Sequence, residues 1–142
     1  MPSITGVSHI DLTVSDLDSS EHWYCDLFGF RKVVDGGSDD HGFSSRYLIH
    51  PETWLIIGLV SHYDHEPSEA FDEHRIGLDH LSFNVESHDE LVAWADRLDQ
   101  KGIDYSPIAE SVLWDVLVFR DPDNIQLELF YMKPEAGALL TA

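Results

Sequence analysis

Cysteine is nearly absent from this chain of 142 residues, which contains a single one, Cys25. One cysteine excludes an intrachain disulfide and the paired cysteines of a zinc ribbon or a dithiol redox site. No apolar run approaches the roughly 20 residues that cross a bilayer, and the opening MPSITGVSH lacks the basic start and apolar core of a signal peptide. We therefore expect a soluble protein of the reducing cytoplasm.

Basic residues are also scarce, because 8 Lys and Arg stand against 27 Asp and Glu, which gives a formal net charge of -19. This charge repels nucleic acid phosphates and anionic membranes, so neither is an expected partner. It is compatible with a salt-adapted host, with a cationic ligand or simply with a solvated acidic surface. Apolar residues are plentiful, and at 43% hydrophobic the chain is long enough to bury a core.

Two short stretches repeat one another across the halves of the chain. GVSHIDLTV, residues 6–14, and GLDHLSFNV, residues 77–85, share a glycine, a histidine and a valine, and His9 and His80 lie 71 residues apart. The same spacing relates four further pairs: Asp18 and Asp89, Trp23 and Trp94, Leu27 and Leu98, and Pro51 and Pro122. A period of this length indicates a duplicated structural unit.

Each half predicts one strand, one helix and three more strands. The helices are expected over 16–29 and 87–102, where Asp or Ser precedes an amphipathic run that ends at glycine. The strands are expected at 6–14, 30–35, 43–50 and 53–60 in the first half, and at 78–85, 104–110, 112–119 and 125–132 in the second. We predict an α+β fold made of two such modules.

The expected domain organisation follows from these elements. One domain covers 1–142 and contains module 1 at about 4–61, an acidic linker at 62–76 and module 2 at 77–133. The polar composition around the linker is typical of a connector or a mobile lid, and the residues after Lys133 are expected to form a short extension.

Strand alternation places polar residues around both histidines. His9 shares a strand face with Asp11 and Thr13, and His80 shares one with Ser82 and Asn84. A polar face is costly in a dry core, so these residues are expected to line a water-accessible cleft.

Glu128 adds a carboxylate on the last predicted strand, among Leu127, Leu129 and Phe130. A carboxylate in such a setting is expected to be paired or bound to metal. Two histidines and one carboxylate, without cysteine, are typical of an Fe(II) or Mn(II) site that keeps open positions. The alternatives are two structural histidines and an ion pair between Glu128 and Arg120.

The chain resembles the vicinal oxygen chelate superfamily, which includes glyoxalase I, extradiol dioxygenases, fosfomycin-resistance thiol transferases, methylmalonyl-CoA epimerases and bleomycin-binding proteins. The resemblance is carried by three stretches: GVSHIDLTVSDLDSSEHWYCDLFGF, GLDHLSFNV and FRDPDNIQLELFY. It implies two βαβββ modules that form a U-shaped mixed sheet around a metal cleft, and a homodimer with the site within one chain or shared between chains. It also implies that His9, His80 and Glu128 are metal ligands.

The superfamily has a fourth ligand position, and the branches differ there. Counting 71 residues back from Glu128 leads to Ile57, which cannot bind a metal and disfavours the glyoxalase I and epimerase branches. The fosfomycin branch carries Lys, Ser and Tyr side chains where this chain has only apolar ones, namely Ile108, Val112, Val116 and Val118. Extradiol dioxygenases share the His, His, Glu set, although Asn124 and Val118 depart from their pattern.

The resemblance therefore implies a small metal-dependent enzyme with a dioxygenase-like reaction on a metal-chelating small molecule. Fe(II) is the favoured ion, with Mn(II), Zn(II) and Ni(II) as alternatives. The candidate proton-transfer residues are Asp11, Tyr47 and Asp115, which lie on strands expected to face the cleft. The competing interpretation is a protein similar to the bleomycin-resistance proteins that sequesters a cationic small molecule.

Overall fold

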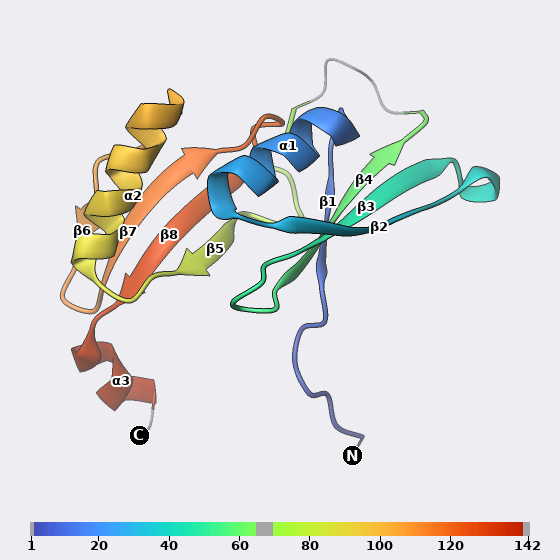
Figure 1. Ribbon diagram of the computed structural model, residues 1–142. Helices are drawn as coiled ribbons and strands as arrows, with labels where there is room; N and C mark the ends of the chain where they lie inside the picture. Colours follow the sequence, from blue (N-terminus) through green and yellow to red (C-terminus); the bar gives the residue numbers. More distant parts are fainter. Residues whose placement is uncertain (1, 65–69, 141–142) are drawn as a thin grey trace. The chain divides into compact units, whose positions relative to one another are not determined.

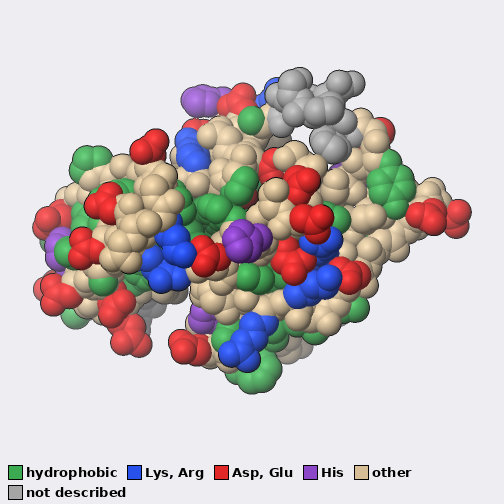
Figure 2. All heavy atoms as spheres, turned by 45° about the horizontal axis from the view of Figure 1, so that its top comes forward, with side chains coloured by type: hydrophobic (Ala, Val, Ile, Leu, Met, Phe, Trp, Pro, Cys, Tyr) green, Lys and Arg blue, Asp and Glu red, His purple; other side chains and the backbone are tan. Residues whose placement is uncertain are grey.

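The computed structural model describes residues 2–64 and 70–140, so residues 65–69 of the predicted linker lie outside the described part. The chain divides into two compact units, Met1–Glu69 and Ala70–Ala142. Figure 1 shows the helices and strands of each unit. None of the helices in the described part is long and apolar enough to cross a membrane. Figure 2 shows one face of the molecule, over which Asp and Glu side chains are spread with few Lys and Arg side chains among them.

The first unit is a four-stranded mixed sheet with one long helix. Its elements are β1 (Ile10–Thr13), α1 (Leu17–Phe28), β2 (Arg31–Ser38), the short 3-10 helix η1 (Asp39–His41), β3 (Phe43–Ile49) and β4 (Ile56–His62). The strand order is β1-β4-β3-β2. Strand β1 is parallel to β4, and the other neighbours are antiparallel.

The second unit repeats this arrangement. Its elements are β5 (Leu81–Asn84), α2 (His88–Lys101), β6 (Ala109–Glu110), β7 (Trp114–Arg120), β8 (Gln126–Met132) and α3 (Pro134–Leu140). The strand order is β5-β8-β7-β6, with β5 parallel to β8. The predicted fold class of two βαβββ modules is confirmed, whereas the helix α3 stands where a plain extension was expected.

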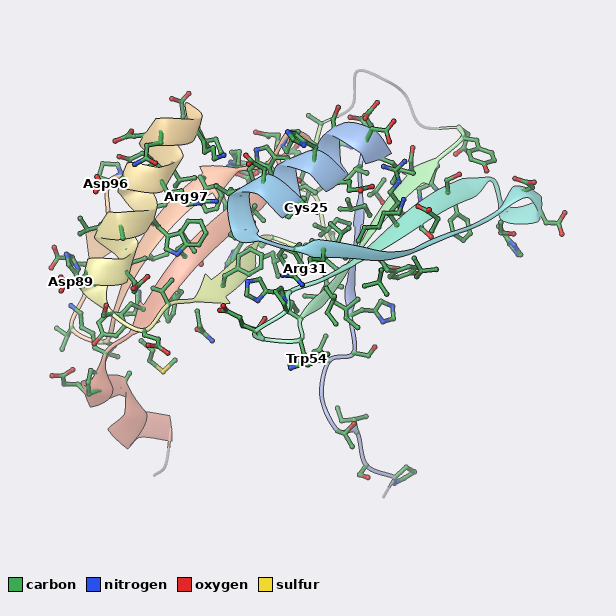
Figure 3. The ribbon with its side chains drawn as sticks, viewed as in Figure 1. Cys25, Arg31, Trp54, Asp89, Asp96 and Arg97 are labelled. Carbon is green, nitrogen blue, oxygen red and sulfur yellow. The ribbon has the colours of Figure 1, made fainter. Side chains whose placement is uncertain are left out.

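Both long helices begin and end where their sequences predict. The side chain of Asp16 accepts a hydrogen bond from the Ser19 amide at 2.7 Å, and that of Ser87 accepts one from the Glu90 amide at 3.2 Å. Each helix ends at a glycine in the left-handed conformation, with φ of 80° at Gly29 and 67° at Gly102. Asp89 and Asp96 lie on the side of α2 away from its sheet in Figure 3.

Each sheet packs one face against its own helix. In the first unit, Leu12, Leu48 and Ile57 are almost completely buried on that face. In the second, Leu117, Leu127 and Leu129 are buried on the corresponding face, against Leu91 and Leu98 of α2. Because strand side chains alternate, the residues between these apolar positions point to the opposite face of each sheet.

The described end of the predicted linker is tied to the turn between β7 and β8. The Phe71 amide donates to the Asp123 carbonyl, and the Asn124 side chain donates to the Phe71 carbonyl. Arg120 donates to both carboxylate oxygens of Glu73, at 2.6 and 2.9 Å. The alternative in which Arg120 pairs with Glu128 is wrong, because the guanidinium is turned to Glu73. Asn124 itself takes a left-handed φ of 67°, which asparagine tolerates better than most residues.

Several predicted strands begin later in the structure, namely β1 at Ile10, β5 at Leu81, β6 at Ala109 and β7 at Trp114, so His9 and His80 lie just before their strands. Strand β4 begins at Ile56, so Trp54, expected on a strand, lies instead in the preceding turn with a φ of 60°. Its side chain is 73% exposed, and Figure 3 shows it at the edge of the β3–β4 connection.

Candidate metal centre

His80 and Glu128 meet in the second unit. His80 directly precedes β5, and Glu128 lies in the neighbouring parallel strand β8, opposite Ser82. The His80 Nε2 lies 3.3 Å from the Glu128 Oε2, and the two side chains are 38% and 17% exposed. Parallel pairing therefore brings two of the three predicted ligands together, although they are far apart in the sequence.

The residue before each histidine makes a hydrogen bond with the Nδ1 atom of the imidazole ring. The His80 Nδ1 lies 2.6 Å from the Asp79 Oδ1, and the His9 Nδ1 lies 2.9 Å from the Ser8 Oγ. A ligating histidine usually engages its second nitrogen in this way, which orients the ring and leaves Nε2 for the metal. Sequence reasoning missed these two residues, and the signal was a polar residue before each histidine, repeated at the 71-residue spacing.

His9 lies just before β1 in the first unit, beside two of the predicted proton-transfer residues. Its Nε2 lies 3.9 Å from the Asp11 Oδ1, and the side chains of His9 and Asp11 are 48% and 40% exposed. Its ring contacts Tyr47 edge to face, with centroids 6.1 Å apart. The structure thus groups Asp11 and Tyr47 with His9 on the sheet face opposite α1.

The position equivalent to Glu128 is Gly58, and the expectation that it is Ile57 is wrong by one residue. Ser82 of β5 stands opposite Glu128, and Asp11, its equivalent in β1, stands opposite Gly58. Ile57 is fully buried on the helix-covered face. A shift of one residue in a strand exchanges the two faces, so counting along the sequence selected a core residue.

Asp115 does not join Glu128. In the β7–β8 register Val118 stands opposite Glu128, whereas Asp115 stands opposite Tyr131, which places Asp115 on the other face of the sheet. Its side chain is 2% exposed and pairs with Lys133 at 2.7 Å and His88 at 3.0 Å. Burial raises the pKa of Asp115, but the hydrogen bonds from Lys133 and His88 outweigh burial, so this pKa lies below its usual value.

Asp115 also borders a cavity of about 350 Å³, which His88, Glu110 and Lys133 help to line. His88, Glu110 and Asp115 lie close enough to offer ligand atoms to one ion. The ammonium group of Lys133 already lies 2.7 Å from the Asp115 carboxylate, so this buried carboxylate has a cationic partner from the chain itself.

The donor atoms of the two histidine pairs suit a divalent ion. Metal–ligand bonds of about 2.0–2.2 Å allow two ligand atoms on one ion to lie up to about 4.3 Å apart. The separations of 3.3 Å at His80 and Glu128 and 3.9 Å at His9 and Asp11 fall within this limit. The Nδ1 atoms have hydrogen-bonding partners and each Nε2 faces a carboxylate oxygen, so a cation bound between them would satisfy both groups.

A sequence model of the glyoxalase/bleomycin resistance protein/dioxygenase superfamily matches residues 6–129. The chain belongs to this superfamily. A solved glyoxylase/bleomycin resistance protein/dioxygenase domain from Frankia sp. EAN1pec is 39% identical, with a TM-score of 0.83 over 93% of this chain and 95% of that one.

A metallothiol transferase and a fosfomycin resistance protein are also similar to this chain. The metallothiol transferase FosB of Shouchella clausii is 26% identical over 129 residues, which cover 89% of this chain and 80% of FosB. The fosfomycin resistance protein FosX of Listeria monocytogenes, solved with Mn(II) and sulfate, is 20% identical. Its TM-score is 0.70 over 96% of this chain and 99% of FosX, which shows a shared fold.

Proposed function

We propose that His9, His80 and Glu128 bind one divalent metal ion and that the protein is a metal-dependent enzyme for a small molecule with two neighbouring oxygens. The observation that carries the proposal is the His80–Glu128 pair, 3.3 Å apart, with the His80 Nδ1 held by Asp79. A divalent ion supplies Lewis acidity there, and Fe(II) adds redox chemistry with dioxygen. FosX, solved with Mn(II), supports a divalent ion in this fold.

The face that carries Glu128 favours an aromatic substrate. Val118 stands opposite Glu128, and Val116 stands opposite Phe130. The Trp114 and Phe130 rings stack with centroids 6.2 Å apart and planes 25° apart. Apolar side chains beside the carboxylate suit a ring better than a phosphonate, which needs cationic partners. We therefore propose a dioxygenase-like reaction on a dihydroxylated ring, with Fe(II) as the favoured ion ahead of Mn(II), Zn(II) and Ni(II).

Tyr47 is the proton-transfer residue that this proposal retains. Its ring contacts His9, so its phenol belongs to the face that carries the first predicted ligand.

The proposal includes a homodimer, as the resemblance implies. Light scattering of the purified protein measures its oligomeric state directly.

The test is metal analysis of the protein purified without chelators, together with His80→Ala. We expect one equivalent of metal per chain in the native protein and a large loss in the variant. His22→Ala, which removes an exposed histidine of α1, is the matched control. A native protein without stoichiometric metal, or a variant with undiminished metal, contradicts the proposal.

The reaction is tested next by oxygen uptake of the Fe(II)-loaded protein with a panel of catechols. Uptake that depends on both the metal and the catechol supports the dioxygenase-like reaction. A metal-loaded protein that consumes no oxygen with any member of the panel rules this reaction out for catechols and leaves the metal site standing.

A further inference from the structure

Gly58 leaves a space on its sheet face, and the side chain of Asp11 fills it. A Cβ atom at residue 58 would overlap the Asp11 Oδ1, and it would lie 2.9 Å from the Asp11 Cγ and 3.0 Å from the Tyr47 Cε1. Real Cβ atoms essentially never approach another atom this closely, so the Asp11 carboxylate lies over residue 58 only because that residue is glycine. A side chain at residue 58 and the Asp11 carboxylate would occupy the same volume, so the sheet face has room for only one of them.

The same place in the second unit holds the carboxylate of Glu128. Ser82 and Glu128 are paired across β5 and β8, as Asp11 and Gly58 are paired across β1 and β4. In the second unit the carboxylate comes from the inner strand β8, whereas in the first it comes from the edge strand β1. Both carboxylates face a histidine Nε2, at 3.3 and 3.9 Å.

We propose that Asp11 is a fourth metal ligand, which supplies from β1 the carboxylate that Gly58 cannot supply from β4. This inference rests on the proposed metal site. Added to the three ligands of the proposed site, Asp11 would complete a set of two imidazoles and two carboxylates, which suits Fe(II) or Mn(II). A six-coordinate ion then keeps about two open positions, enough for a chelating substrate. Dioxygen binding beside a bound chelate would require Asp11 to leave the ion.

The experiment measures the affinity for Mn(II) and the number of Mn(II)-bound waters, by calorimetry and water-proton relaxation. We expect Asp11→Ala to lower the affinity at least about tenfold, the minimum effect of losing even an outer partner of a ligand. We also expect the number of bound waters to rise by about one, because the vacated position is hydrated. Thr13→Ala, on the same exposed face of β1, is the matched control and should change neither quantity.

Each outcome separates this inference from the function on which it rests. Lower affinity with an unchanged water number places Asp11 outside the coordination sphere and overturns the inference, as does unchanged affinity. If the native protein binds no Mn(II), the proposed function fails first. If Asp11→Ala does not fold, the same two quantities are measured on Asp11→Ser, because a serine is tolerated on an exposed edge strand.

Discussion

The two units fill one position of a duplicated fold from different strands. In the second unit, Glu128 of β8 reaches His80 from the neighbouring strand, whereas in the first, Asp11 reaches His9 from two residues further along the same chain segment. The position equivalent to Glu128 is Gly58. The comparison shows that a carboxylate can reach the same place on a sheet face from either of two adjacent strands, because side chains from these strands compete for the same volume.

The units also differ in what holds each imidazole. Asp79 offers a charged acceptor at 2.6 Å to the His80 Nδ1, and Ser8 offers a neutral hydroxyl at 2.9 Å to the His9 Nδ1. A charged acceptor makes the stronger hydrogen bond and holds the ring more firmly in one orientation. The second unit therefore carries the better prepared half of the proposed metal site.

The largest expected effect comes from the carboxylate of the second unit. Glu128→Gln keeps the shape of the side chain and removes its charge, so we expect the affinity for Mn(II) to fall by more than about 100-fold, beyond the usual loss for an outer partner. Isothermal titration calorimetry measures this loss. Glu90→Gln, at an exposed position of α2, removes the same charge and is expected to bind normally. Equal affinities in the two variants would show that Glu128 is not a ligand.

The two histidine partners give a direct comparison between the units. Asp79→Asn is expected to lower Mn(II) affinity by about 10–100-fold, because the imidazole of His80 loses its charged partner. Ser8→Ala is expected to lower it less, since the lost hydrogen bond is neutral. Calorimetry on both variants compares the two losses of Mn(II) affinity. A larger loss in Ser8→Ala would show that the first unit, and not the second, holds its imidazole more firmly.

Gly58→Ala tests the space over β4. The added methyl group overlaps the Asp11 carboxylate, and we expect a loss of about 1–3 kcal/mol in the free energy of unfolding, as for other overpacked sites. Urea denaturation measures it, and Gly77→Ala, where a Cβ meets nothing within 4 Å, is the control. The cost of Gly58→Ala should fall in an Asp11→Gly background, and additive effects of the two changes would mean that the two positions do not compete.

The smallest expected effect is a pH dependence at the Glu73–Arg120 pair. The hydrogen bonds from Arg120 lower the pKa of Glu73 to about 2 in the folded protein, from the ordinary 4.5. The folded pKa is the lower one, so the contribution to stability is complete above about pH 4.5 and is lost as the pH falls toward 2. Amide hydrogen exchange of residues 71–77 should be faster in Glu73→Gln than in the native protein at pH 7, and this difference should shrink toward pH 2.

Local features of the sequence predicted the helices and the duplicated fold well. Asp16, Ser87, Gly29 and Gly102 delimit the two long helices because capping depends on residues within one turn. The repeated histidines predicted the duplication, and strand alternation placed Asp11 on the face of His9. The prediction for the fourth position failed because the 71-residue spacing, which relates Pro51 to Pro122, becomes 70 between Gly58 and Glu128. The first unit holds one more residue in this interval, which includes the turn with Trp54.

The sequence by itself therefore determined the two βαβββ units, their helix ends and the identity of three candidate ligands, because these depend on local patterns and on a long repeat. Tertiary structure alone decided which residues share a face across neighbouring strands. Strand pairing brought Glu128 to His80, put Asp115 on the opposite face and laid Asp11 over Gly58. Register between strands depends on turn lengths and on packing of the whole sheet, so a single residue in one turn changes which side chain meets which.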